Sequence, residues 1–152
     1  MASQNEARFQ RANFVVTDID RALTLYRDVL GFELAFIKDS PDDSYSYDVF
    51  DIDRDKPIRF AVLGTESQVR VMALTEVPGP LPPVPMPRRS AIVVEVSDVD
   101  AVVAGAKAAG CTVVDEGVLM THDGRRGREV GIVDFDDNLT VIYHIPAAGD
   151  AG

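Results

Sequence analysis

Residues 14–31 of the chain read FVVTDIDRALTLYRDVLG, an apolar run that leads through an acidic turn into an amphipathic segment. After Asp18, apolar residues recur at the spacing of a helix, and the Asp18 carboxylate is suited to cap the start of that helix. Gly31 fits the position just beyond a helix end, where the backbone adopts a left-handed conformation. The stretch therefore predicts a strand followed by a capped helix.

The same pattern occurs again in the second half of the chain. Residues 93–110 read VVEVSDVDAVVAGAKAAG, in which Asp98 takes the place of Asp18 and Gly110 that of Gly31. Such an internal repeat indicates two copies of one structural unit. Further strands are expected after each glycine, at residues 32–37, 58–63 and 69–74 in the first half and at residues 112–114, 129–134 and 139–145 in the second. Each half then has the order βαβββ.

A proline-rich stretch, residues 78–87, separates the two units. Six of its ten residues, PGPLPPVPMP, are proline, which fixes φ and lacks an amide donor. We expect an extended linker that acts as a spacer, and a docking motif for a proline-binding partner is the alternative. The predicted modules are then residues 8–77 and residues 88–145, followed by a flexible tail at residues 146–152.

The first module contains an acidic insertion at residues 39–56. Tyr45, Tyr47 and Phe50 alternate in it as they would in a strand. The two tyrosines are candidates for the aromatic walls of a binding site, and ordinary strand packing is the alternative.

Composition excludes several classes of protein. The net charge of −10 repels nucleic acid and anionic membranes, so neither is expected as a partner. One cysteine, Cys111, rules out an intramolecular disulfide, and we expect it to fill space in the core. Two histidines are too few for a histidine-rich metal centre. Residues 1–11 are polar and lack the apolar core of a signal peptide, so a cytoplasmic protein is expected.

Three stretches resemble one family. VVTDIDRALTLYRDVLGFEL and VVEVSDVDAVVAGAKAAGCTV are similar to the openings of the two modules of the vicinal oxygen chelate superfamily, which includes glyoxalases, bleomycin resistance proteins and extradiol dioxygenases. VDFDDNLTVIYHI resembles the closing hairpin, with Phe135 and Asp137 in place of the usual proline and glycine. The resemblance implies an α+β fold in which two βαβββ modules form a cup-shaped mixed sheet. Helices cover its convex face, and a homodimer covers its edges.

Many members of this superfamily hold a divalent metal at the centre of the cup, and the resemblance implies where its ligands would lie. The four corresponding positions are Arg11, Ala73, Ala91 and Val141. None of these side chains is a metal ligand, and a guanidinium has only donors. We therefore expect no metal and no other cofactor.

Strand alternation around those positions predicts the lining of the cup. The candidate ligand-binding residues are Arg11, Asn13, Val71, Ala73, Ala91, Val93, Glu95, Val141 and Tyr143. This mostly apolar set suits a small organic ligand. Arg11 is suited to hold an anionic group of that ligand, and the alternatives are an internal ion pair with Glu95 or an exposed strand end.

The loop MTHDGRRGRE contains a basic patch. His122, Arg125 and Arg126 are candidates for a mobile lid over an anionic ligand, and a solvated loop is the alternative. His144 alternates with Tyr143, so it is expected to face the helices or a subunit contact.

The favoured function is metal-free binding of a small molecule. The alternative is a lyase, isomerase or dioxygenase with a displaced or non-metal site, for example one that uses His122, Tyr143 or Glu95 as an acid or base. No catalytic residue is assigned.

Overall fold

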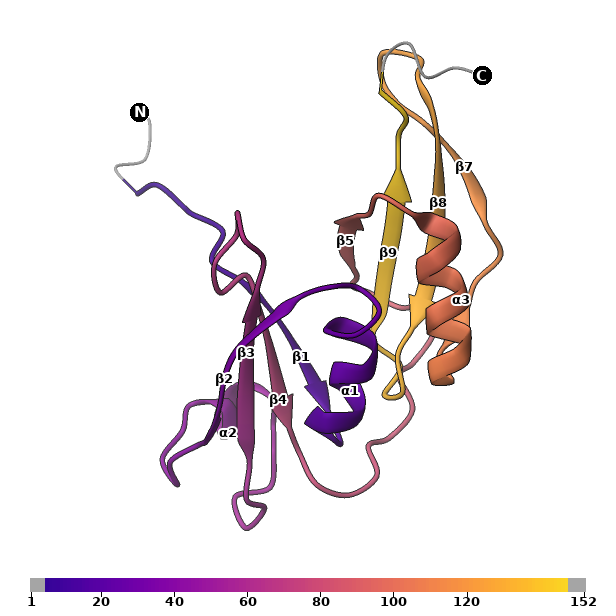
Figure 1. The fold of residues 1–152 in the computed structure, drawn as a ribbon. Coiled ribbons are helices and arrows are strands. Elements are labelled where there is room, and N and C mark those ends of the chain that lie inside the picture. The colour runs from indigo at the N-terminus through magenta and orange to yellow at the C-terminus, as the bar shows by residue number, and fades with distance from the viewer. Residues whose placement is uncertain (1–4, 148–152) are drawn as a thin grey trace.

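A computed structural model describes residues 5–147 and contains two sheets, each with one main helix (Figure 1). The first module contains β1 (Ala12–Val16), α1 (Ile19–Tyr26), β2 (Glu33–Asp39), α2 (Ser46–Val49), β3 (Arg59–Gly64) and β4 (Met72–Glu76). The second contains β5 (Ile92–Glu95), α3 (Val99–Ala109), β6 (Thr112–Val113), β7 (Gly117–Met120), β8 (Arg126–Val133) and β9 (Leu139–His144).

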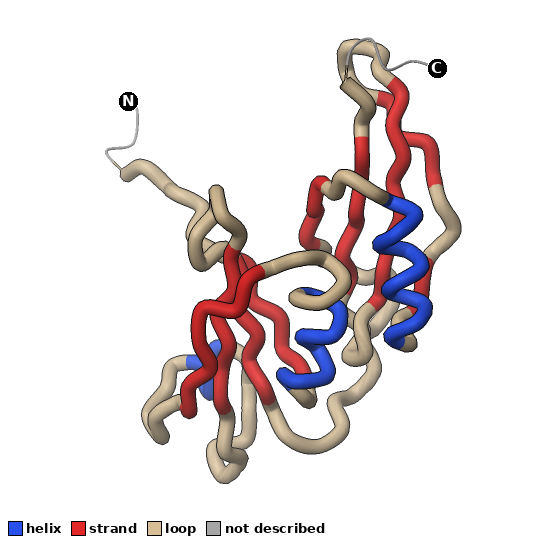
Figure 2. Tube along the Cα trace, in the orientation of Figure 1, coloured by secondary structure: helices blue, strands red, loops and turns tan. Residues whose placement is uncertain are grey.

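The strand order shows that the two modules are built alike. It is β1-β4-β3-β2 in the first sheet and β5-β9-β8-β6 in the second, where β7 also pairs with β8. In each sheet the first strand pairs in parallel with the last, and the other pairs are antiparallel. The predicted α+β fold with two repeated modules is therefore confirmed. The linker, residues 78–87, has no regular secondary structure and leads from one sheet to the other (Figure 2).

The predicted caps at both helix starts are present, and the two glycines differ in their distance from the helix end. Asp18 Oδ1 accepts a hydrogen bond from the Arg21 amide at 3.1 Å, and Asp98 Oδ1 accepts one from the Ala101 amide at 3.0 Å. Gly31 and Gly110 have φ angles of 83° and 95°, in the left-handed region that favours glycine. Gly110 directly follows α3, whereas α1 ends at Tyr26 and the turn residues 27–30 separate it from Gly31. The same local chemistry therefore starts both helices, but a glycine directly ends only α3.

Both modules share one hydrophobic core. Helices α1 and α3 contact each other, and each also covers one face of its own sheet (Figure 1). The approach is close, because a Cβ added at Gly105 of α3 would lie 3.1 Å from Cγ1 of Val29. The largest side chains that are fully buried include Ile19, Leu25, Tyr26, Leu63, Met72, Leu74, Ile132 and Ile142. The other face of each sheet is turned away from its main helix.

A buried carboxylate joins the two modules. Asp134, in the turn between β8 and β9, accepts a hydrogen bond from the hydroxyl of Tyr26 on α1 at 2.6 Å. Its Oδ1 accepts from the amides of Asp136 and Asn138 at 2.8 and 2.9 Å. Burial raises the pKa of Asp134, although these hydrogen bonds act against the rise. Burial and then the charge of Asp134 raise the pKa of Tyr26 far above its usual range.

Neighbouring residues of the same turn bind the start of α1. Asp136 accepts hydrogen bonds from the amide and hydroxyl of Thr17 at 3.0 and 2.8 Å. Asn138 donates to the carbonyl of Val15 at 3.0 Å. We call this cluster the polar junction; it comprises Thr17, Tyr26, Asp134, Asp136 and Asn138.

The insertion differs from its expected form. Residues 46–49 form the short helix α2, so the predicted strand is wrong. Tyr47 is buried with Ile58 and Val77, and its hydroxyl donates to the carbonyl of Lys56 at 2.6 Å. Tyr45 is 73% exposed. In a strand, Tyr45 and Tyr47 would point to the same face. In the structure Tyr47 is buried and Tyr45 faces solvent, which a helical turn allows.

Two further features were not expected from the sequence. Strand β7 is an additional short strand whose second edge is unpaired within residues 5–147, and β6 has only two residues. Part of the predicted tail, residues 148–152, lies outside the described residues. None of the helices within residues 5–147 has the length and apolar character needed to span a bilayer.

Candidate functional site

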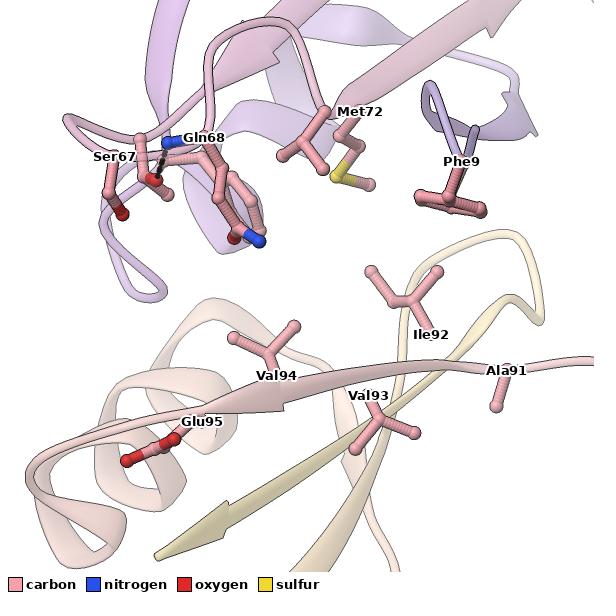
Figure 3. A pocket seen from close by; sticks show the side chains of 13 residues that line it. Phe9, Ser67, Gln68, Met72, Ala91, Ile92, Val93, Val94 and Glu95 are labelled. Carbon is pink, nitrogen blue, oxygen red and sulfur yellow. Dashed lines mark hydrogen bonds between the residues drawn. The ribbon is translucent and has the colours of Figure 1, made fainter. Parts of the chain in front are cut away.

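A cleft of about 640 Å³ lies between the two modules. One wall is β5 together with the residue before it, and the other comes from the first module (Figure 3). Ile92 and Val94 point across the cleft toward the side of Phe9, Met72 and Gln68. The full lining is Phe9, Ala12, Phe32, Thr65, Ser67, Gln68, Val71, Met72, Ala91, Ile92, Val93, Val94 and Glu95.

The position of β5 explains why five consecutive residues line the cleft. This strand pairs only with β9, so its other edge is free within the described chain. Side chains from both faces of β5 therefore border the same hollow. Val93 is 66% exposed and Phe9 is 77% exposed. A free strand edge beside exposed apolar side chains is a typical binding surface.

Glu95 is the sole ionisable side chain among the described residues that line this cleft. It lies at the end of β5, and its Oε2 accepts a hydrogen bond from the hydroxyl of Tyr143 at 3.1 Å. That hydrogen bond is the main cause that raises the pKa of Tyr143, with smaller contributions from desolvation and from the charge of Glu95. Tyr143 therefore stays protonated at neutral pH and acts as a hydrogen-bond donor.

A second hollow of about 530 Å³ adjoins Glu95. It lies between the loop after α1 and the start of α3, and its carboxylates are Asp28, Glu95 and Asp98. Asp28 is paired with Arg27 at 2.8 Å, and Asp98 caps α3. No lysine or arginine is part of the described lining of either hollow.

Four of the nine predicted ligand-binding residues line the cleft: Val71, Ala91, Val93 and Glu95. Two more, Val141 and Tyr143, lie on the same face of the second sheet as Val93 and Glu95, because they are the paired neighbours of these residues. They extend the surface beyond the cleft.

The remaining three predicted residues lie elsewhere. Asn13 and Ala73 are paired on the face of the first sheet that points away from α1, where Asn13 Oδ1 accepts a hydrogen bond from Thr75 Oγ1 at 3.1 Å. Arg11 is exposed just before β1, and it is not part of the cleft lining. The structure therefore does not bring Arg11 together with Glu95.

Most of the wall formed by the first module was not predicted from the sequence, apart from Val71. Phe9, Phe32, Gln68 and Met72 line the cleft, although none was predicted. One signal was available for Phe9, which is a single aromatic residue in a polar segment. The other three come from a helix-following turn, a hairpin loop and a core face of β4, and no periodicity distinguishes them from ordinary structure.

The predicted lid lies in the turn between β7 and β8. His122 and Arg125 are exposed in this turn, and Arg126 is exposed at the start of β8. None of the three lines the cleft. Arg125 is paired with Asp123 at 3.0 Å. His144 is half-buried, with Nδ1 2.9 Å from the carbonyl oxygen of Val96. Cys111 is buried, and burial raises the pKa of its thiol.

The residues present do not fit a divalent metal. Arg11, Ala73, Ala91 and Val141 occupy the positions that the resemblance assigns to ligands, and their side chains supply no oxygen or neutral nitrogen donor. Within residues 5–147, no three His, Cys, Asp or Glu side chains come together in a group that could hold an ion.

Together, the paired modules and the hollow between them define a two-module α+β protein with a site large enough for a small molecule. The family model for the Glyoxalase/Bleomycin resistance protein/Dioxygenase superfamily matches residues 8–140, and the chain belongs to this superfamily. A comparison with curated proteins gives no match.

Solved structures show the same fold. A glyoxalase family protein from Bacillus cereus has a TM-score of 0.73 at 16% identity, over 97% of this chain and 99% of that one. Glyoxalase I of Leishmania major, described as trypanothione-dependent, has a TM-score of 0.61 at 20% identity, over 91% of this chain and 87% of that one. A fosfomycin resistance protein from Listeria monocytogenes, complexed with Mn(II) and a dihydroxypropylphosphonic acid, has a TM-score of 0.55 at 14% identity. The similarity covers 91% of this chain and 90% of that one.

Proposed function

We propose that this protein binds a small organic molecule in the cleft between its modules, without a metal. The observation that supports the proposal is the cleft itself, about 640 Å³ with mostly apolar walls and a few polar groups. Binding sites for small molecules have volumes of roughly 300–1,000 Å³ and this kind of lining. The superfamily includes proteins named for glyoxalase, dioxygenase and drug-resistance functions, which is consistent with a site for a small ligand.

Filling the cleft is expected to weaken binding. Gln68 is an exposed residue of the lining whose side chain points toward β5 (Figure 3), and Gln68→Trp places an indole in the space that a ligand would occupy. We expect the affinity for the aromatic probe 4-phenylbutanol to fall at least about tenfold, or about 1.4 kcal/mol. The measurement is a titration that follows the backbone amide NMR signals of residues 92–95.

A matched control keeps the cleft open. Ala104→Trp adds the same side chain at an exposed position of α3 that does not line the cleft, and it should bind the probe like the unmodified chain. Added Mn²⁺ or a chelator should leave the affinity unchanged. Equal affinity in the Gln68→Trp variant, or binding that requires metal, would contradict the proposal.

We also propose that the protein is a homodimer. The outer edge of β7 is unpaired within the described chain, and Val118 and Met120 of this strand are 55% and 58% exposed. Free sheet edges with exposed apolar side chains are usually covered. A second copy that pairs its own β7 with this edge would cover the unpaired backbone groups and the neighbouring side chains of Val118 and Met120.

Light scattering tests the dimer directly. A mass near twice the chain's 16.5 kDa is expected at micromolar concentration, and Val118→Asp should reduce it to that of one chain. Val49→Asp, which introduces the same charge at an exposed apolar residue of α2, should remain dimeric. A mass near 16.5 kDa for the unmodified protein would refute the dimer.

A further inference from the structure

We propose that the ligand of the cleft is an amphipathic cation, with an apolar body between the walls and an ammonium or guanidinium group bound at Glu95. The inference rests on the proposed binding function and adds the chemical class of the ligand. It also replaces the anionic ligand suggested by Arg11, because Arg11 does not line the cleft.

Glu95 has unused capacity to bind a cation. Among the described residues its carboxylate accepts one hydrogen bond, from Tyr143, and forms no ion pair with a lysine or arginine. An ionised carboxylate has about four acceptor sites, so several stay free for a ligand. Tyr143 fixes the orientation of the group without neutralising its charge.

The net charge of the whole chain adds to the charge of Glu95. In the adjoining hollow of about 530 Å³, Asp28 is paired with Arg27 and Asp98 caps α3, so Glu95 is the carboxylate there that a ligand would use. The net charge of the chain is −10, so the long-range field also attracts cations. A cation at the mouth of the cleft would therefore be stabilised by Glu95 directly and by the net charge of the chain over a longer range.

The inner part of the cleft suits an apolar group. Ile92 and Val94 on β5 lie opposite Phe9 and Met72, with Gln68 farther along (Figure 3). Glu95 lies at the end of this space, on the side of β5 that faces away from Met72 (Figure 3). The charged end of the ligand would thus stay partly in water while the apolar end is buried.

The test compares three probes that share one skeleton. 4-Phenylbutylamine is a cation at pH 7.5, 4-phenylbutanol is neutral, and 4-phenylbutyrate is an anion. Each is titrated at low salt while the amide NMR signals of residues 92–95 are followed. We expect the amine to bind about fivefold more tightly than the alcohol, as for an ion pair of about 1 kcal/mol at a partly solvated site. The butyrate should bind more weakly than the alcohol.

Two variants, each of which removes one negative charge, identify the responsible group. Glu95→Gln should lose the preference for the amine over the alcohol. Asp43→Asn, at an exposed position away from both hollows, should keep the full preference.

The outcomes separate the two proposals. If the alcohol binds at the cleft and the amine has no advantage, or the advantage survives in the Glu95→Gln variant, the cationic ligand is overturned and the binding function stands. Tighter binding of the butyrate would also overturn it. If none of the three probes shifts the signals of residues 92–95, the binding function itself is contradicted, and this inference with it.

Discussion

Replacing Asp134 by Ala is expected to destabilise the protein by about 3–4 kcal/mol, the largest effect of a single substitution outside the hydrophobic core. The carboxylate is buried and accepts hydrogen bonds from the Tyr26 hydroxyl, two backbone amides and the side chain of Asn138. The substitution leaves these donors without partners, and each unsatisfied buried donor costs about 1–3 kcal/mol. The variant no longer has to bury a charged carboxylate, and this gain offsets part of the loss. The net destabilisation is therefore smaller than the summed cost of the unpaired donors.

Thermal and urea unfolding would measure this loss. A domain of this size loses about 2–4 °C in Tm for each kcal/mol, so a fall of roughly 10 °C is expected. Asp115→Ala removes an exposed carboxylate from a loop of the same module, and it should change stability by less than about 0.5 kcal/mol. Equal stability of the two variants would show that the polar junction does not hold the modules together.

A loss of stability above pH 10 is expected to depend on Tyr26. Burial raises the pKa of Tyr26 in the folded state, whereas the unfolded phenol ionises near pH 10. Because the pKa of Tyr26 is higher in the folded state, its contribution to stability is complete below the pKa of the unfolded phenol. That contribution is lost as the pH rises toward the pKa of Tyr26 in the folded state. In this range the unfolded state releases a proton that the folded state keeps, so stability falls by about 1.4 kcal/mol per pH unit.

Tyr26→Phe isolates this contribution. The variant should be less stable than the unmodified protein at pH 7, because Asp134 loses one donor. Above pH 10 the difference should shrink, since phenylalanine has no proton to release. Urea unfolding between pH 8 and pH 12 follows this change, and Tyr45→Phe, at a ring that is 73% exposed, should parallel the unmodified protein. A constant difference across the range would contradict the assignment.

Local chemistry made the two modules predictable from the sequence. Asp18 and Asp98 cap the starts of their helices, and Gly110 directly follows α3, because these positions need specific side-chain and backbone properties within a few residues. The repeat of the pattern then indicated the repeat of the module. The insertion was not predictable in this way, because Tyr47 packs against Ile58 and Val77, and such packing overrides local alternation.

Part of the site was also predictable, because alternation within a single strand is a local pattern. Strand alternation identified Val93 and Glu95 because both belong to one strand and share a face with Val141 and Tyr143. It placed Arg11 in the same cup, since counting along strands assigns equivalent positions in two modules without fixing how the modules meet.

The sequence by itself therefore determined the module, its repetition and the superfamily, because helix caps, glycines and apolar periodicity act over short distances along the chain. The tertiary structure alone decided which surfaces meet. The polar junction around Asp134 fixes one module against the other, and this arrangement leaves the free edge of β5 opposite Phe9 and Met72. Residues far apart in the sequence form that cleft, and no local pattern encodes their contact.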